Sequence, residues 1–414
     1  MEEVEAQGWY PTGDQWVCEQ CVDEPFLASK VREASSPEHT CSFCDESPAA
    51  ELDVFMEAFM NGVTRRYEDA DNEHRYDSET GEYLGNVFDT DELVWEYEHV
   101  FANHDLLEAV RASIVDKTWT DNDFWYYTPS EALSSGWERF RHAVMFESRY
   151  VFWLREDWQG QDYDADGIHP AKVMQALSDY VEKHDLYRTI EPGKSFWRAR
   201  THTEAEVSWG AKELGTAGRE HAKQANRMSP AGIPMFYGAE DADTAVKESL
   251  VRTSDTHVTV ASFEATQPFT VVDLTGSKIP LEPSEFDIER FAERHRILFL
   301  RDFVKELTQP IRESYEQIDY VPTQILTEYL LKVHRPESGH RIDGLMYTSA
   351  VTGKTCAVLD VSNKRCIDRD EEIERFADDK LHLKMDASSP RTFKIRRDYE
   401  PLPPTNADPF ARRV

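Results

Sequence analysis

SFWRAR, residues 195–200, follows the turn-forming Glu191-Pro192-Gly193 and marks the point at which the sequence pattern changes. Its composition predicts a β-strand, in which Arg198 and Arg200 point to the same face of a sheet. More β-type runs follow at 235–237, 257–263, 269–274, 344–347 and 357–361. Helical segments lie between them at 241–251, 288–307 and 322–333. Strands and helices in this irregular order predict an α+β domain over residues 189–370, and not a doubly wound sheet.

The residues before this strand are mainly helical in pattern. Apolar residues recur at helical spacing after residue 51, namely Leu52, Phe55, Met56, Phe59 and Val63. Further helical segments are predicted at 91–103, 106–115, 129–154 and 171–184. We therefore expect an α-helical domain over residues 51–188, with the aromatic residues of the 129–154 segment in its core. Residues 371–414 form a charged C-terminal extension, with one more strand predicted at 392–395.

Four of the six cysteines are clustered, as Cys18-x-x-Cys21 and Cys41-x-x-Cys44. The first residues lack the pattern of an export signal, so disulfides are disfavoured and a metal site is the better interpretation. Two such thiolate pairs predict a tetrahedral Cys₄ site for zinc. Four sulfur ligands leave no open coordination position, so we expect a structural zinc that folds the 1–50 segment. A docking surface for a partner stays open as its alternative role.

The formal net charge of −33 is spread along the chain. Such a surface repels phosphate backbones and therefore disfavours general nucleic-acid binding. An anionic ligand would need a local group of arginines, which makes arginines inside motifs informative. The sequence also lacks an apolar run of membrane-spanning length, so we expect a soluble, cytoplasmic protein without a membrane partner.

Four segments of the second half carry residues of chemical interest. They are FWRAR (196–200), ANRMSPAGIPMFYGA (225–239), TAVKE (244–248) and DGLMYTSAVTG (343–353). Taken alone, Arg198 could be a surface ion-pair partner and Tyr237 a core aromatic residue. Glu248 could be a solvated helix residue, and Ser349 could be a turn former. The four segments together, in their order, are more informative than any one of them.

In this order the segments resemble the RES domain family, which is named for an Arg, a Glu and a Ser. The first matching feature is an aromatic–Arg strand (Phe196, Trp197, Arg198). A loop with Arg227, Pro230 and Gly232 follows, and then a strand that ends in Tyr237. The last features are a helix with Glu248 and a strand end with Gly344, Tyr347 and Ser349. YVPTQILTEYL (320–330) is similar to the helix before that last strand. The front half is similar to the HEPN-related region fused to some RES domains. Residues 51–188 lack the Arg-to-His spacing of HEPN ribonucleases, so that activity is not implied.

Some positions depart from the family pattern. Ala225 and Asn226 stand where many relatives have two glycines before the loop arginine. Thr348 replaces the usual proline before the serine, and Val351 replaces an arginine often found two residues after it. The loop and phosphate contacts are therefore less firmly implied than the Arg–Glu–Ser set.

The resemblance implies an ADP-ribosyltransferase-like fold and cleavage of NAD with release of nicotinamide. The implied residues are Glu248, Arg198 and Ser349 as the catalytic set, with Arg227, Tyr237, Arg200 and Tyr347 at the substrate. Arginine suits the NAD pyrophosphate because a guanidinium forms paired hydrogen bonds with phosphate oxygens. Departure of nicotinamide leaves positive charge on the ribose, which the Glu248 carboxylate would stabilise. Tyr237 would stack on the nicotinamide ring, and Ser349 would hydrogen-bond ribose or amide.

The acceptor of the ribosyl group stays open in the sequence. Water would give hydrolysis and inorganic phosphate would give phosphorolysis. Such an enzyme would deplete cellular NAD as a toxin or defence effector, with an antitoxin or other neutralising protein as partner, and homo-oligomers are not excluded. A macromolecular acceptor would instead make the protein an ADP-ribosyltransferase. A non-catalytic module that recruits partners through its zinc and helical parts is a third hypothesis, against which the complete Arg–Glu–Ser set argues.

Overall fold

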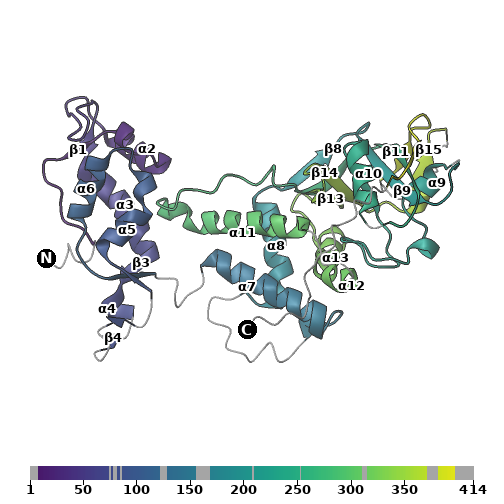
Figure 1. Ribbon diagram of the computed structural model, residues 1–414, viewed down its shortest axis with the longest axis horizontal. Coiled ribbons are helices and arrows are strands. Elements are labelled where there is room, and N and C mark those ends of the chain that lie inside the picture. Colours follow the sequence, from purple (N-terminus) through teal and green to yellow (C-terminus); the bar gives the residue numbers. More distant parts are fainter. Residues whose placement is uncertain are drawn as a thin grey trace, which may run out of the picture. The chain divides into compact units, whose positions relative to one another are not determined.

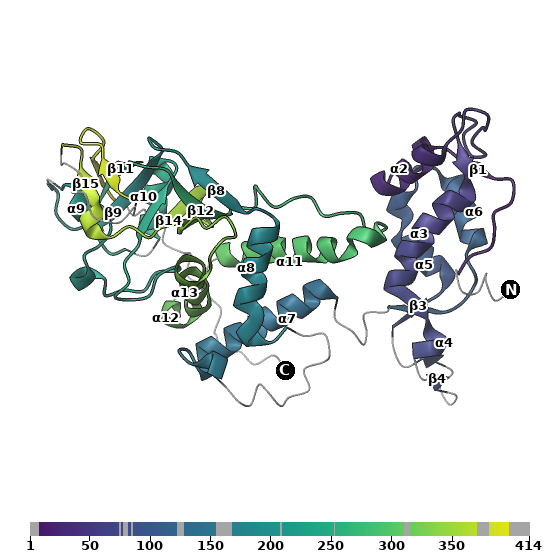
Figure 2. The same ribbon diagram turned by 180° about the vertical axis from the view of Figure 1, so that it is seen from behind.

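The computed structural model describes residues 8–73, 76–77, 82–83, 86–121, 128–154, 168–207, 209–251, 253–309, 315–370 and 381–396. The chain forms two compact units, whose elements Figures 1 and 2 show from opposite sides. The first unit comprises Met1–Ala143, Tyr150–Val173 and Ile279–Phe303, and the second comprises Val144–Arg149, Met174–Lys278 and Val304–Val414.

The first unit is mainly helical. Its longer helices are α2 (Pro25–Ala34), α3 (Leu52–Arg66), α5 (Thr90–Glu96), α6 (His104–Ser113), α7 (Pro129–His142) and most of α11 (Phe291–Thr308). Short strands pair between them: β1 (Trp16–Val17) with β2 (Ala50–Glu51), and β7 (Trp119–Asp121) with both β3 (Tyr67–Asp69) and β6 (Val87–Phe88). Asp89 and Thr128 open α5 and α7 with capping boxes, which satisfy backbone N–H groups that lack intrahelical partners. The predicted helical character of this region is confirmed.

The core of the first unit includes a residue from far along the chain. Phe286 is only 2% exposed, and its ring stacks on that of Phe59 in α3 with centroids 5.4 Å apart. The ring of Tyr97 lies 5.6 Å from that of Phe286. A Cβ atom on Gly62 would approach Phe286 Cδ1 to 2.5 Å, so the close packing of this ring requires glycine in α3.

One helix is shorter than predicted, and this changes where its aromatic residues lie. The helix predicted at 129–154 is α7 only to His142, followed by a π-helical turn at Ala143–Glu147 and a 3-10 turn at Phe152–Leu154. Trp137 and Phe140 are buried as expected. Tyr150 and Trp153 are exposed, as is Phe146, because the helical repeat that would bring them to the same face ends before they are reached. The expectation that these three residues belong to the core is therefore wrong.

The described residues of the second unit build a ten-stranded mixed sheet. Its order is β15-β16-β11-β9-β10-β14-β13-β12-β8, with β17 also paired to β11. The strands are β8 (Tyr187–Ile190), β9 (Ser195–His202), β10 (Phe236–Ala239), β11 (His257–Ala265), β12 (Phe269–Leu274), β13 (Ile342–Thr348), β14 (Thr355–Leu359), β15 (Cys366–Asp368), β16 (Leu383–Met385) and β17 (Arg391–Lys394). Strands β12 and β13 are parallel neighbours, as are β15 and β16. The sequence did not predict β8, β15 or β16, which are short and lie towards the two ends of the sheet.

Strand β9 separates two packed layers. Phe196 packs in one core cluster with Ala211 and Leu214 of the short helix α9 (Ala211–Leu214). Trp197 packs against another cluster that includes Ala245 of α10 (Ala242–Leu250). Because successive residues of a strand point to opposite faces, α9 and α10 cover opposite faces of β9. We call these the α9 face and the α10 face.

The compact units differ from the predicted domain boundaries in two places. Nearly all of α8 (Val173–Lys183) belongs to the second unit, and so does β8, although both lie largely before residue 189. Conversely, Ile279–Phe303 belongs to the first unit, because this segment contributes Phe286 to that core. None of the described helices is long and apolar enough to cross a lipid bilayer.

The role of Phe286 can be tested by truncating its side chain. Phe286→Ala should destabilise the first unit by about 3–5 kcal/mol, the usual cost of removing a buried phenylalanine ring. Leu281→Ala is the matched control, because Leu281 lies in the same segment and is 83% exposed. This control should change the free energy of unfolding by less than about 0.5 kcal/mol. Denaturant unfolding followed by circular dichroism measures the free energy of unfolding of both variants. A loss in Phe286→Ala as small as that in Leu281→Ala would show that Phe286 does not complete the core.

Candidate active site

Glu248 and Ser349 come together from α10 and from the end of β13. The Ser349 hydroxyl donates a hydrogen bond to Glu248 Oε1. Ser349 Oγ in turn accepts hydrogen bonds from the backbone N–H groups of Val351 (3.1 Å) and Thr352 (3.0 Å). Ser349 is 2% exposed, so its hydroxyl is fully engaged. Its position suits holding the carboxylate in place better than acting as a free nucleophile.

The turn that follows Ser349 is attached to the first turn of α10. Thr352 Oγ1 lies 3.2 Å from Thr244 Oγ1, and Lys354 Nζ lies 3.4 Å from Asp241 Oδ2. Asp241 is also the N-cap of α10, since it accepts a hydrogen bond from Thr244 N–H at 2.9 Å. These contacts were not predicted, although an aspartate three residues before a threonine at a helix start is a sequence signal for such a cap.

Two tyrosines lie on the α10 face close to Glu248. Burial raises the pKa of Tyr237 to about 12. Burial, followed by the neighbouring Cys356 and Glu248, raises the pKa of Tyr347 well above its ordinary value. The Tyr237 hydroxyl accepts a hydrogen bond from Met228 N–H (3.2 Å). Both phenols are therefore neutral at physiological pH, so Glu248 has uncharged aromatic neighbours.

Cys356 lies opposite Tyr347 in the pairing of β14 with β13. Burial raises the pKa of this thiol to about 12, and Glu248 adds to the effect. The thiol is therefore neutral as well. The sequence singled out Cys356 only as a cysteine outside the N-terminal cluster, because a lone cysteine gives no spacing signal.

Arg227 lies on the same side as the two tyrosines. Its guanidinium donates to the carbonyl oxygens of Leu307 and Gln309, both at 2.7 Å, at the C-terminal end of α11. Its positive charge lowers the pKa of Tyr347, which opposes the effect of burial there. The loop backbone is held by α13 (Val321–Glu328), where Gln324 Nε2 donates to the Asn226 carbonyl at 2.8 Å. Arg227 is therefore held at a defined place, from which its charge acts on Tyr347.

Arg198 and Arg200 share a strand face, as predicted, but it is the α9 face. Arg198 Nε donates to the carbonyls of Leu214 and Gly215, both at 3.0 Å, and its Nη1 donates to the Tyr237 carbonyl at 2.7 Å. Burial lowers the pKa of Arg198 to about 10, and the charge of Arg200 acts in the same direction. Arg200 has a single long contact, 3.5 Å to the Gly215 carbonyl, and burial also lowers its pKa.

The structure thus brings together only part of the predicted set. Glu248 and Ser349 are hydrogen-bonded, and Glu248, Tyr237 and Arg227 each have an electrostatic effect on Tyr347. Arg198 and Arg200 are separated from Glu248 by the sheet, because β9 directs their side chains away from α10. Arg198 reaches the site only through the backbone of Tyr237. Residue spacing alone does not predict which face of a strand will carry α10.

The four N-terminal cysteines form a compact group of sulfur atoms. Their Sγ atoms all lie within 4.8 Å of one another, and Cys18 Sγ is 3.3 Å from Cys44 Sγ and 3.7 Å from Cys21 Sγ. Four sulfurs bound to zinc at about 2.3 Å in a tetrahedron lie roughly 3.8 Å apart, whereas a disulfide requires about 2.05 Å. The group therefore fits a metal ion better than disulfides, and it could hold zinc.

Two family models match separate parts of the chain. The model of HEPN/RES N-terminal domain 1 matches residues 34–157, and the RES domain model matches residues 195–386. No curated protein and no solved structure matches the chain. The second match contains Glu248, Ser349 and the other predicted site residues outside the cysteine cluster. The chain therefore carries a RES domain that follows an HEPN/RES N-terminal domain, in agreement with the resemblance seen in its motifs.

Proposed function

We propose that this protein cleaves NAD at the bond between nicotinamide and ribose, through an ADP-ribosyltransferase-like RES domain. The observation that carries the proposal is the Glu248 carboxylate, held by the Ser349 hydroxyl beside two neutral tyrosines. Among the described residues, no cation is in ion-pair contact with Glu248. In this proposal its negative charge acts on a positive charge that develops on a bound substrate.

The chemistry of the reaction matches this arrangement. Loss of nicotinamide moves positive charge from the pyridinium ring to an oxocarbenium-like ribose. A carboxylate fixed beside the ribose stabilises this transition state more strongly than the ground state. Ser349 holds the carboxylate, so little reorganisation is needed as the charge develops. Neutral Tyr237 and Tyr347 offer aromatic surface to the nicotinamide ring, and Arg227 offers positive charge to the pyrophosphate. Water or inorganic phosphate would then take the ribosyl group.

The biological role that we propose is depletion of cytoplasmic NAD by a toxin or defence effector, restrained by a neutralising protein. The direct test is incubation of the purified chain with NAD, with and without phosphate, followed by separation of the products. Free nicotinamide with ADP-ribose indicates hydrolysis, and a phosphorylated ADP-ribose indicates phosphorolysis. Label from NAD on a macromolecule would point instead to ADP-ribosyl transfer.

Glu248→Gln tests the carboxylate. The substitution keeps size and hydrogen bonding but removes the charge, so NAD turnover should fall roughly 100-fold or more, as for loss of other transition-state charge stabilisation. NAD affinity should change little, because the charge acts mainly in the transition state. Glu264→Gln is the control, since Glu264 is an exposed residue of β11 and should keep wild-type turnover. A fully active Glu248→Gln enzyme would exclude Glu248 as the catalytic carboxylate.

The arginines are tested by calorimetric titration of NAD in the Glu248→Gln background. Arg227→Ala should weaken NAD binding by about 1.5–3 kcal/mol, the range for hydrogen bonds to charged groups, and lysine should not restore it. The sequence predicts the same loss for Arg198→Ala. The position of Arg198 predicts instead a loss of stability with unchanged affinity of the folded protein, because its guanidinium lies on the α9 face, across the sheet from Glu248. Arg200→Ala is the comparison, and equal wild-type affinities in all three variants would contradict a phosphate contact by any of them.

We further propose that Cys18, Cys21, Cys41 and Cys44 bind a structural zinc ion. Metal analysis should find about one zinc per chain, and Cys41→Ser should lower this content. Chelation should unfold the N-terminal segment first and leave the sheet of the second unit intact. Cys366→Ala is the control, because Cys366 lies in β15 outside the cluster and should not alter the zinc content. Metal-free protein of unchanged stability would disprove the proposal.

A further inference from the structure

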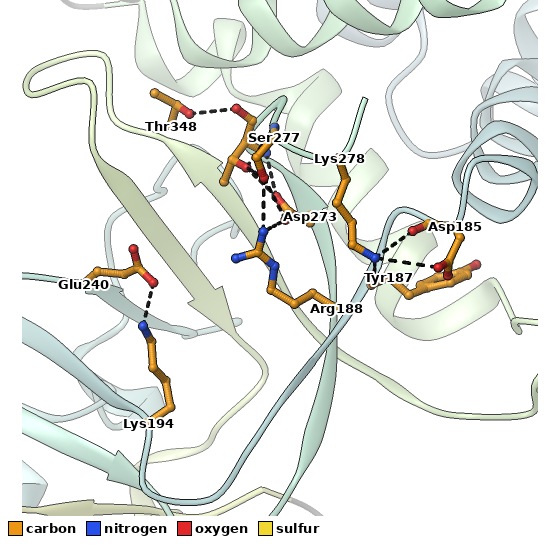
Figure 3. A network of polar contacts seen from close by, with 10 residues as sticks. Asp185, Tyr187, Arg188, Lys194, Glu240, Asp273, Ser277, Lys278 and Thr348 are labelled. Carbon is orange, nitrogen blue, oxygen red and sulfur yellow. Dashed lines mark hydrogen bonds and ion pairs between the residues drawn. The ribbon is translucent and has the colours of Figure 1, made fainter. Parts of the chain in front are cut away.

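An ion pair with a buried carboxylate lies at the end of β12, next to the strand that leads to Ser349 (Figure 3). Asp273 is completely buried and lies 2.5 Å from Nη2 of Arg188 in β8. The Asp273 carboxylate also accepts hydrogen bonds from the N–H (3.0 Å) and hydroxyl (2.6 Å) of Thr275. A buried carboxylate is tolerated only with such partners, so the pair determines where the following turn lies.

The turn at residues 275–278 is attached to β8 and the residues before it. Arg188 Nη2 donates to Ser277 Oγ at 3.1 Å, and Lys278 Nζ donates to the carbonyl of Asp185 at 3.0 Å. Gly276 has a φ of +83°, a backbone conformation that favours glycine and makes the turn tight. Figure 3 shows the contacts of Arg188 with Asp273 and Ser277, and beside them the contact of Lys278 with Asp185.

This turn contacts the residue that precedes Ser349. The Thr348 hydroxyl donates to the Thr275 carbonyl at 3.2 Å. Strands β12 and β13 are parallel neighbours with Leu274 opposite Tyr347, so the turn after one lies beside the end of the other. Thr348 is therefore held on one side while the next residue, Ser349, holds Glu248.

We propose that the Arg188–Asp273 pair and Thr348 are positioning residues for the catalytic carboxylate. The ion pair fixes the 275–278 turn, the turn fixes Thr348, and Thr348 fixes the backbone from which Ser349 holds Glu248. This inference rests on the proposed function of Glu248, and the three residues act on the carboxylate through Ser349. They act by holding the carboxylate close to the geometry that the transition state requires.

The test removes one hydroxyl with little change of shape. Thr348→Val should lower kcat for NAD cleavage roughly 10- to 100-fold with KM nearly unchanged, because small misplacements of a catalytic group cost rate rather than binding. Thr348→Ser keeps the hydroxyl and should retain most of the activity. Thr266→Val is the matched control: the Thr266 hydroxyl donates to the His382 carbonyl at 3.1 Å, before the opposite end of β12. It should lose stability to a similar extent and keep wild-type kcat.

A second measurement separates failure of this inference from failure of the proposed function. Thr348→Val and Glu248→Gln, alone and combined, should change the equilibrium constant of unfolding non-additively, by more than about twofold. The same cycle with Thr266→Val should be additive. If the stability effects of Thr348→Val and Glu248→Gln are non-additive but the wild type cleaves no NAD, the positioning role is retained and the proposed reaction is rejected. Additive stabilities together with wild-type kcat in Thr348→Val would overturn the positioning role. Arg188→Lys supports the assignment if it lowers kcat in a folded protein, and unchanged kcat there contradicts it.

Discussion

The alternation of side chains along β9 is the constraint on which the arrangement of the second unit depends. Trp197 must face α10 and Phe196 must face α9, because each completes a different core cluster. This alternation assigns Arg198 to the layer opposite Glu248. Strand β9 therefore supports the candidate site by its packing and through its neighbour β10. It does not direct Arg198 towards the Glu248 carboxylate.

The electrostatics of the candidate site are simple for so acidic a chain. The Glu248 charge acts on the phenol of Tyr347 and the thiol of Cys356, and both of these groups are neutral, as is the buried phenol of Tyr237. The field that acts on Tyr347 and Cys356 therefore includes a contribution from the Glu248 carboxylate. The overall charge of −33 is spread over the chain and does not by itself determine this local field.

The sequence predicts the elements of the fold better than their assembly. The spacing of apolar residues predicts α3, and the β-type runs predict β9 to β14. Both predictions succeed because the spacing of apolar residues along a segment reflects which of its side chains are buried. Edge strands such as β15 are too short to give a clear pattern. The motifs also predict Glu248 and Ser349, which the structure joins. The face occupied by Arg198, and the segment that carries Phe286 into the first unit, depend on tertiary packing that residue spacing does not encode.

The position of Phe286 also bears on how the chain is made. A chain grows from its N-terminus at about 5–20 residues per second, so roughly 7 to 29 s pass between the synthesis of Ala143 and that of Phe286. During this interval the rings of Phe59 and Tyr97 lack a neighbour that covers them in the finished protein. The nascent chain therefore carries an incomplete apolar core while β8 to β12 leave the ribosome, and this is the period in which a chaperone has most to bind.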